Sequence, residues 1–280
     1  MKTPWKPDQP IPFPEYPRPQ LRRAGWMNLN GLWDYAIRAS GDEKPMHYDG
    51  KILVPFPVES QLSRVEKALQ PDETLWYRRS FSLPNAWEAQ KVLIHFGAVD
   101  FACQLWINGQ EIGSHQGGYL PFSFDISEAL REGENSILLA VSDPTDSGLQ
   151  ERGKQVLKPQ GIWYTAVSGV WQTMWLEPVP ERHISDIRVT PDLDASEIQV
   201  ETILSPGEAV DDLEIALTLF DQSEVVAETV CEKDQTAYLR IKNPKPWSPE
   251  SPHLYGLKVR LVEKGKVVDE ITSYAALRKF

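Results

Sequence analysis

The sequence lacks the residue patterns on which most metal-binding and redox sites depend. Among its 280 residues there are only two cysteines, Cys103 and Cys231, which lie far apart along the chain. Two such cysteines form no disulfide framework and have no metal-ligand spacing, so we expect both to be small buried side chains. The five histidines are scattered and show no ligand spacing either. The sequence therefore predicts no cofactor and no metal ion.

Basic charge and long apolar runs are also scarce. Lys and Arg number 29 against 40 Asp and Glu, which gives a formal net charge of -11. Without a basic face the chain is not expected to bind nucleic acid. No segment approaches the roughly 18 consecutive apolar residues of a membrane helix, so no membrane partner is expected. The first residues, MKTPWKPDQPIPFPEYPRPQ, contain no apolar signal-peptide core, which favours a cytoplasmic location.

Helical periodicity is nearly absent. The exception is ISEALREGEN, where Asp125 can cap one short turn and Gly133 can end it. The rest is a series of short runs rich in Val, Ile, Phe, Trp and Tyr, bounded by turn residues. Examples are KILVPFPV, LWYRRSFSL, KVLIHFGAV, FACQLWI and SILLAVS. This pattern predicts an all-β fold of the sandwich or jelly-roll type.

Changes of texture along the chain predict three segments. Residues 1–27 form a proline-rich extended arm that cannot be regular helix or central strand. Residues 28–179 carry the short strands of a jelly-roll domain. From residue 180 to 280 a more regular series of about seven strand-length runs is typical of an immunoglobulin-like sandwich, although the Cys…Trp…Cys pattern of antibody domains is missing. Within the arm, Trp5, Phe13 and Tyr16 indicate that it packs on the protein surface.

One stretch, LWINGQEIGSHQGGYLPFSFDIS (105–127), specifies its backbone closely but contains no nucleophile or metal site. Asn108-Gly109 between strand-like flanks is the strongest short hairpin signal. Gly117-Gly118 then permits backbone conformations that other residues resist, and Pro121 prevents continuation as a central strand. A hairpin followed by a shaped loop is expected, and a simple stiff connector is the alternative.

An ordered set of motifs resembles glycoside hydrolase family 2, the family of β-galactosidases, β-glucuronidases and β-mannosidases. The 105–127 stretch resembles the core motif of the family's N-terminal sugar-binding domain. The flanking motifs, in order, are LNGLWDY, VPFPVES, LWYRRSFSLP, GENSILLAVSD and SGVWQTMWLEPV. PWSPESPHLYGLKVRL and SYAALRKF resemble the end of the family's second, immunoglobulin-like domain. The resemblance covers almost the whole chain from Asn28, and it implies a galactose-binding-like jelly roll followed by an immunoglobulin-like domain.

The resemblance also implies where the chemistry resides. Family members are retaining glycosidases, which need two carboxylates about 5–5.5 Å apart. The family carries them on a (β/α)₈ barrel after the second sandwich, and no βαβα alternation is present in this sequence. We therefore expect no catalytic residue here and an inactive isolated chain. Its expected role is to support and shape the active site of a barrel, which would be its packing partner, and to contribute to a homo-oligomer interface.

Tentative sugar contacts follow from the same resemblance. In some members the first domain sends a loop with an aspartate into the active site, but the matching LKPQGIWYTAVSGVWQ contains no acid. This loop offers rings to stack on a sugar and donors for its hydroxyls, although both aromatic residues could instead pack beneath it. The expected contacts are Lys158, Gln160, Trp163 and Tyr164, with His115 and Gln116 in the 105–127 stretch and Glu59 in VPFPVES. For Asp100, Asp125, Asp143 and Asp146 structural roles are expected.

Two other functions remain open at this point. A free-standing carbohydrate-binding module would bind sugar as an isolated chain and lose binding on Trp163→Ala. A structural or adhesive pair of sandwiches would expose a large apolar patch for a partner. A chain that supports a barrel predicts such a patch too, so only the identity of the partner separates these two hypotheses.

Overall fold

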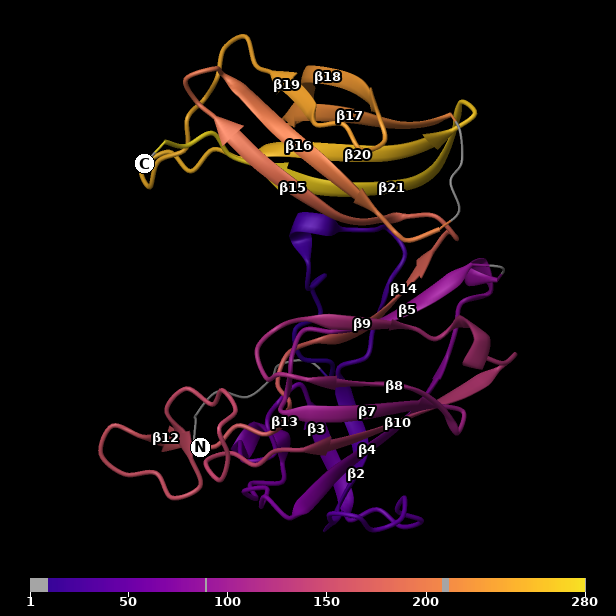
Figure 1. Cartoon of the computed structure of the whole chain (residues 1–280), viewed down its shortest axis with the longest axis vertical. Helices are drawn as coiled ribbons and strands as arrows, with labels where there is room; N and C mark the ends of the chain where they lie inside the picture. Colours follow the sequence, from indigo (N-terminus) through magenta and orange to yellow (C-terminus); the bar gives the residue numbers. More distant parts are fainter. Residues whose placement is uncertain (1–9, 89, 208–211, 280) are drawn as a thin grey trace. The chain divides into compact units, whose positions relative to one another are not determined.

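The computed structural model describes residues 10–88, 90–207 and 212–279, and they form two compact units. The N-terminal unit comprises the described residues up to Pro17 together with Trp26–Pro178. The C-terminal unit comprises Arg18–Gly25 and the described residues from Val179 onward. Helical structure in the described chain is limited to 3₁₀ turns of three residues, and strands dominate both units (Figure 1). No described helix is long and apolar enough to cross a bilayer.

The N-terminal unit is a jelly roll, as predicted. Its larger sheet has the order β3-β2-β4-β10-β7-β8 and its second main sheet the order β1-β14-β5-β9. The strands of the larger sheet are β2 (Gly31–Ala39), β3 (Gly50–Val54), β4 (Glu73–Ser82), β7 (Ala102–Ile107), β8 (Gln110–Gln116) and β10 (Glu134–Ser142). Those of the second are β1 (Met27–Asn28), β5 (Lys91–Phe96), β9 (Phe122–Asp125) and β14 (Met174–Val179). Two short pairs complete it, β6 (Val99–Asp100) with β13 (Gly169–Val170) and β11 (Gln155–Val156) with β12 (Tyr164–Thr165).

Side-chain alternation explains why the central strands lie where they do. In β10 the residues Asn135, Ile137, Leu139 and Val141 are buried, whereas those between them are half-buried. Successive strand residues point to opposite faces, so this pattern buries one face of the sheet in the core. The expected hairpin joins β7 to β8, with positive φ at Asn108 (52°) and Gly109 (86°). The core of the unit thus sits between the two main sheets, with its largest rings from Trp33, Tyr77 and Phe96.

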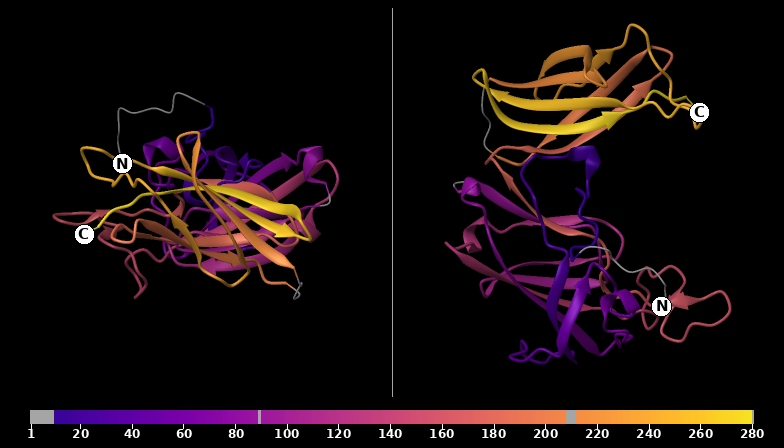
Figure 2. Two further views of the ribbon diagram at one scale, coloured as in Figure 1. Left: turned by 90° about the horizontal axis from the view of Figure 1, so that it is seen from above. Right: turned by 180° about the vertical axis from the view of Figure 1, so that it is seen from behind.

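The C-terminal unit is the predicted immunoglobulin-like sandwich. One sheet has the order β15-β16-β19 and the other the order β18-β17-β20-β21. Its strands are β15 (Ile184–Asp192), β16 (Glu197–Leu204), β17 (Leu213–Asp221), β18 (Glu224–Glu232), β19 (Ala237–Arg240), β20 (Tyr255–Glu263) and β21 (Lys266–Ala275). The long β20–β21 pair is visible in both views of Figure 2 as adjacent yellow strands. Cys103 in the N-terminal unit is buried as expected, but Cys231 on β18 is only half-buried, and both thiols are free.

The arm predicted for residues 1–27 is divided between the two units. Phe13 packs on Phe56 with ring centroids 5.9 Å apart, and Tyr16 packs edge-on against Trp26 at 5.2 Å. The expected packing of Phe13 and Tyr16 is therefore observed, while Trp5 lies outside the described residues. Leu21 instead lies in the core of the C-terminal unit at 1% exposure.

Residues 18–25 extend the edge of the C-terminal sandwich. The backbone of Arg22 pairs with Thr272 of β21 through two N–H···O hydrogen bonds of 2.9 Å. The Arg23 guanidinium bonds to the Asp269 carboxylate at 2.7 and 3.3 Å and to the Ile184 carbonyl at 2.6 Å. Local sequence patterns could not predict that the arm divides between the two units. The partners of Arg22 and Arg23 lie some 160 to 250 positions away in the sequence.

Candidate functional site

Two loops of the N-terminal unit, residues 117–121 and 143–168, expose a set of large apolar side chains. Figure 1 shows the longer loop, which carries β12, extending well out from the sheets. Large apolar side chains exposed together on neighbouring loops are candidates for contact with a partner or a ligand. The exposed side chains, which we call the platform, are Tyr119, Leu120, Leu149, Ile162, Trp163 and Tyr164.

A buried polar cluster ties the two ends of the long loop together. The Glu59 carboxylate accepts hydrogen bonds from the backbone N–H of Ser168 at 3.0 Å and of Leu69 at 3.4 Å. The Ser168 hydroxyl donates to Asp143 at 2.7 Å, and Asp143 also accepts from the Thr145 N–H at 2.7 Å. Because these bonds join the first and last residues of the loop, its base is held in one arrangement.

The short loop is held by Trp171 and by close packing on Asp100. The Trp171 indole N–H donates to the Gly118 carbonyl at 2.8 Å, and its ring packs edge-on against Tyr119 at 6.2 Å. A Cβ at Gly118 would lie only 2.5 Å from Oδ1 of Asp100, so only glycine fits here. The expectation of a shaped loop is thus met, and its shape positions Tyr119 and Leu120 on the platform.

The carboxylates at the base of the two loops are buried, and burial raises the pKa of two of them. Burial raises the pKa of Glu59 to about 7. Burial, together with the nearby carboxylates of Asp143, Glu151 and Glu59, raises the pKa of Asp100 to about 7. The Asp100 side chain is 3% exposed and accepts no hydrogen bond from the described residues. These groups cannot reach a sugar on the surface, so their contribution is to the fold and its pH dependence.

The structure brings four of the seven predicted sugar contacts together. Lys158, Gln160, Trp163 and Tyr164 occupy the exposed tip of the long loop. The backbone N–H of Trp163 donates to the Gln160 carbonyl at 3.1 Å, and the backbone of Tyr164 pairs with Gln155 of β11. At 41% and 66% exposure, Trp163 and Tyr164 do not pack beneath the loop, so that alternative is wrong. Their rings remain available to a sugar or a partner.

The other three predicted contacts lie elsewhere. Glu59 is 4% exposed and belongs to the base of the loop, so the expectation that it faces a ligand is wrong. His115 and Gln116 both lie on β8, where Gln116 faces the outer side of the larger sheet and His115, opposite the buried Cys103, faces the inner side. The His115 ring stacks on Phe122 with centroids 3.8 Å apart. Sequence reasoning also missed the burial of Asp100, since an aspartate after a strand is an ordinary turn signal.

Gly169 follows the last residue of the long loop, and its substitution tests how closely the base of the loop packs against Tyr77. Its φ is +89°, and a Cβ there would overlap the Tyr77 hydroxyl, which accepts a hydrogen bond from the Val170 N–H at 3.2 Å. Gly169→Ala is therefore expected to destabilise the unit by about 3 kcal/mol or more in urea unfolding. The matched control is Gly41→Ala, since Gly41 has a similar φ of +91° but open space around its Cβ. Equal losses in both variants would contradict the close packing against Tyr77.

Comparison with known proteins assigns this arrangement to a family. The profile of "Glycosyl hydrolases family 2, sugar binding domain" matches residues 41–180, and that of "Glycosyl hydrolases family 2" matches residues 182–278. The chain belongs to glycoside hydrolase family 2. The resemblance drawn from the ordered motifs is thereby confirmed, as is the order of the two family 2 domains.

Curated relatives within family 2 share about a third of the aligned residues. A putative β-glucuronidase of Formosa agariphila is 31% identical over 212 residues, covering 73% of this chain and 25% of that protein. A β-galactosidase of Alteromonas mediterranea is 31% identical over 266 residues, covering 88% of this chain and 24% of that protein. The chain thus spans about a quarter of the length of these relatives.

Solved structures confirm the fold of the family 2 domains. The apo β-glucuronidase from Ruminococcus gnavus superposes with a TM-score of 0.73 at 23% identity, covering 91% of this chain and 46% of that one. A Bifidobacterium dentium β-glucuronidase complexed with coumarin-3-O-glucuronide gives a TM-score of 0.72 at 22% identity. It covers 90% of this chain and 48% of that one.

Proposed function

We propose that this chain is the non-catalytic N-terminal portion of a family 2 glycosidase, and that its platform packs against a catalytic (β/α)₈ barrel. The observation that carries the proposal is the platform itself. Six large apolar side chains are exposed on two loops whose bases are held by buried hydrogen bonds. A braced loop with exposed aromatic and aliphatic side chains is suited to a permanent interface, because little conformational entropy is lost on docking.

The carboxylates of the loop base do not provide the chemistry in this proposal. A retaining glycosidase places two carboxyl groups on either side of the scissile bond, where both contact the sugar. Glu59, Asp100 and Asp143 are 4%, 3% and 3% exposed and lie in the interior of the unit. The intact protein would hydrolyse O-glycosidic bonds with retention, using carboxylates supplied by the barrel.

Carbohydrate would meet this chain at the tip of the long loop. Trp163 and Tyr164 offer aromatic faces, and Lys158 and Gln160 lie beside them as hydrogen-bond donors. A ring that packs on the C–H face of a sugar next to amine and amide donors is a common sugar-binding arrangement. These contacts would be completed by the barrel. The relatives' names divide between β-galactosidase and β-glucuronidase, so both substrate classes belong in the test.

The test is to read the gene beyond the codon for Phe280 and to assay two proteins. One is this 280-residue chain and the other is the product of the whole reading frame. Both are incubated with 4-nitrophenyl β-D-galactoside and 4-nitrophenyl β-D-glucuronide. We expect release of nitrophenol by the whole product and none by the chain alone. Hydrolysis by the chain alone, or a frame that encodes no strand–helix alternation after residue 280, would refute the proposal.

A substitution on the platform tests its role as an interface. In the whole protein, Ile162→Asp places a charge where the barrel would dock, and desolvating an unpaired carboxylate costs several kcal/mol. We expect at least about a tenfold loss of kcat/KM, or a comparable rise in proteolytic release of the barrel. Met46→Asp is the matched control, since Met46 is also an exposed apolar residue of the N-terminal unit but lies off the platform. Similar behaviour of the two variants would argue against docking at the platform.

A further inference from the structure

The second half of the long loop is basic, although the chain as a whole is acidic. From Arg152 to Leu176 the sequence contains no Asp or Glu, while it contains three cations, Arg152, Lys154 and Lys158. The acids of the loop all precede this segment, at Asp143, Asp146 and Glu151. With 29 Lys and Arg against 40 Asp and Glu in the whole chain, this segment reverses the average charge of the protein.

A turn at residues 152–154 brings two of these cations to the platform. The backbone N–H of Tyr164 donates to the Lys154 carbonyl at 2.8 Å, so Lys154 lies next to Tyr164. A Cβ at Gly153 would be only 3.4 Å from the Tyr119 hydroxyl. The turn therefore lies between Tyr119 of the short loop and Tyr164 of the long loop, both of which belong to the platform.

The two cations have no counter-charge of their own. Arg152 and Lys154 form no ion pair with any described residue, whereas elsewhere in the unit Arg38 pairs with Asp49 at 2.8 Å. The neighbouring Glu151 carboxylate lies near the short loop, with Oε1 3.5 Å from the position of a Cβ on Gly117. Unpaired cations beside exposed apolar side chains make a surface that is complementary to an acidic one.

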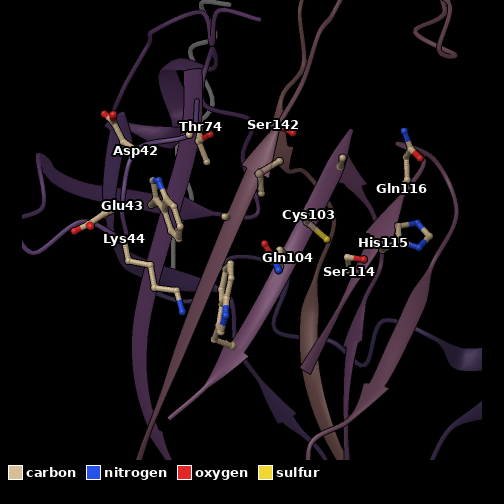
Figure 3. A pocket seen from close by; sticks show the side chains of 16 residues that line it. Asp42, Glu43, Lys44, Thr74, Cys103, Gln104, Ser114, His115, Gln116 and Ser142 are labelled. Carbon is tan, nitrogen blue, oxygen red and sulfur yellow. The ribbon is translucent and has the colours of Figure 1, made fainter. Parts of the chain in front are cut away.

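A groove on the outer face of the larger sheet provides the contrast (Figure 3). Lys44 on its lining has the carboxylates of Asp42 and Glu43 directly before it in the sequence. The Lys44 ammonium also lies 4.1 Å from the centroid of the Trp106 ring, which attracts a cation. The charge at this groove is thus balanced within the chain, and the charge at the platform is not.

We propose that the surface on which the platform docks is acidic, with carboxylates that face Arg152 and Lys154. This inference rests on the proposed function, in which that surface belongs to the catalytic barrel. A retaining glycosidase concentrates two carboxyl groups at its active site, so the barrel surface around that site would carry negative charge. Complementary charges would orient the barrel on the platform and speed its docking, while the apolar side chains would supply most of the affinity.

The experiment measures how well the platform is protected from chymotrypsin in the product of the whole reading frame. This protease cleaves after large apolar residues, and Leu149 and Tyr164 of the platform are both exposed. We expect rapid cleavage there in the 280-residue chain and slow cleavage in the whole protein. Arg152→Glu combined with Lys154→Glu should speed cleavage of the whole protein at least about tenfold, because like charges would then face each other across the contact.

Arg131→Glu is the matched control for Arg152→Glu taken singly. Arg131 is also exposed, but it precedes β10, whereas the long loop follows that strand. We expect wild-type protection in the control and unchanged melting temperatures in all of these variants. In the wild-type whole protein, raising NaCl from about 20 mM to about 500 mM should speed cleavage about threefold relative to the isolated chain, because salt screens exposed charges. In the combined variant salt should slow cleavage, since it then screens a repulsion.

Each contrary outcome identifies which idea fails. Equal cleavage of the isolated chain and the whole protein would show an undocked platform, which refutes the proposed function and this inference with it. Protection that persists in the combined variant and does not change with salt refutes the acidic surface alone.

Two further results would give the cations to another partner and so overturn the inference. Loss of 4-nitrophenyl β-D-glucuronide hydrolysis in the combined variant, with unchanged protection and unchanged galactoside hydrolysis, would assign them to an anionic substrate. A dimer of the 280-residue chain in sedimentation that the combined variant no longer forms would assign the acidic surface to a second copy of the chain.

Discussion

Arg23→Ala is expected to destabilise the C-terminal unit by about 3–5 kcal/mol, the usual loss when one partner of a buried ion pair is removed. Arg23 and Asp269 are 6% and 7% exposed, and their side chains form two N–H···O bonds of 2.7 and 3.3 Å. Without the guanidinium, the buried Asp269 carboxylate loses the cationic partner that it contacts at 2.7 Å. The Ile184 carbonyl also loses a donor at 2.6 Å.

The Asp269 carboxylate explains why the effect should extend beyond the ion pair. It accepts hydrogen bonds from the backbone N–H of Ile184 at 2.7 Å and of Glu270 at 3.0 Å. It therefore joins the first strand of the unit, the last strand and the segment at residues 18–25. Loss of Arg23 weakens all three attachments, and amide exchange should rise at Ile184, Glu270 and Thr272.

Hydrogen exchange by mass spectrometry measures this locally, since it reports on each unit of the chain separately. Arg22→Ala is the matched control, because the Arg22 side chain is exposed and its contact with Thr272 is made by the backbone. We expect near wild-type exchange for Arg22→Ala and strongly increased exchange for Arg23→Ala, confined to the C-terminal unit. Equal protection in the two variants would show that the buried pair contributes nothing net.

The second large effect is a loss of stability of the N-terminal unit as the pH rises. The folded-state pKa values of Glu59 and Asp100 are raised to about 7, whereas an unfolded chain has values near 4. Between these limits the folded state binds more protons than the unfolded state, so the free energy of unfolding falls with increasing pH. The carboxylates cause no penalty below about pH 4, and the penalty is complete above about pH 7.

Asp100→Asn separates this effect from other titrations. It removes the charge of a buried carboxylate that accepts no hydrogen bond from the described residues. The substitution therefore breaks no hydrogen bond while it removes the titrating group. We expect the variant to be more stable than the wild type by about 2–4 kcal/mol at pH 8, and by only about 1 kcal/mol at pH 5, where most of the wild-type penalty has not yet developed. The measurement is thermal or urea unfolding across this range.

Asp72→Asn is the control, since Asp72 is an exposed aspartate of the same unit. It should leave the pH dependence of unfolding unchanged. A wild-type protein that is as stable at pH 8 as at pH 5 would contradict the raised pKa values. An Asp100→Asn variant with an unaltered pH dependence would show that other groups cause the loss of stability.

Some features of this protein were determined by local sequence. Asn108-Gly109 adopts its hairpin because both residues tolerate positive φ, which few other pairs do. Asp125 accepts a 3.0 Å hydrogen bond from the Ser127 N–H beside the turn at Ser127–Ala129, but the prediction that it caps this turn and that Gly133 ends it is wrong, because the N-cap is Ile126 and the C-cap is Leu130. The alternation in ENSILLAVS likewise selects the buried face of β10. Such signals depend on residues within a few positions of each other, and together with the order of the motifs they were enough for the fold class and the family.

The site depended on contacts between residues that are distant in sequence, which no local pattern encodes. Glu59 was expected to face a ligand, and it is buried because Ser168, 109 positions later, supplies its hydrogen bond. The arm divides between the units because Arg23 finds Asp269 at a separation of 246. The groove on the larger sheet exists only because the register places Ala140 between Trp76 and Gln104. The sequence alone therefore determined which strands form and to which family they belong. Tertiary structure decided which charges are buried and which surfaces remain open, because burial and register are properties of the assembled sheets.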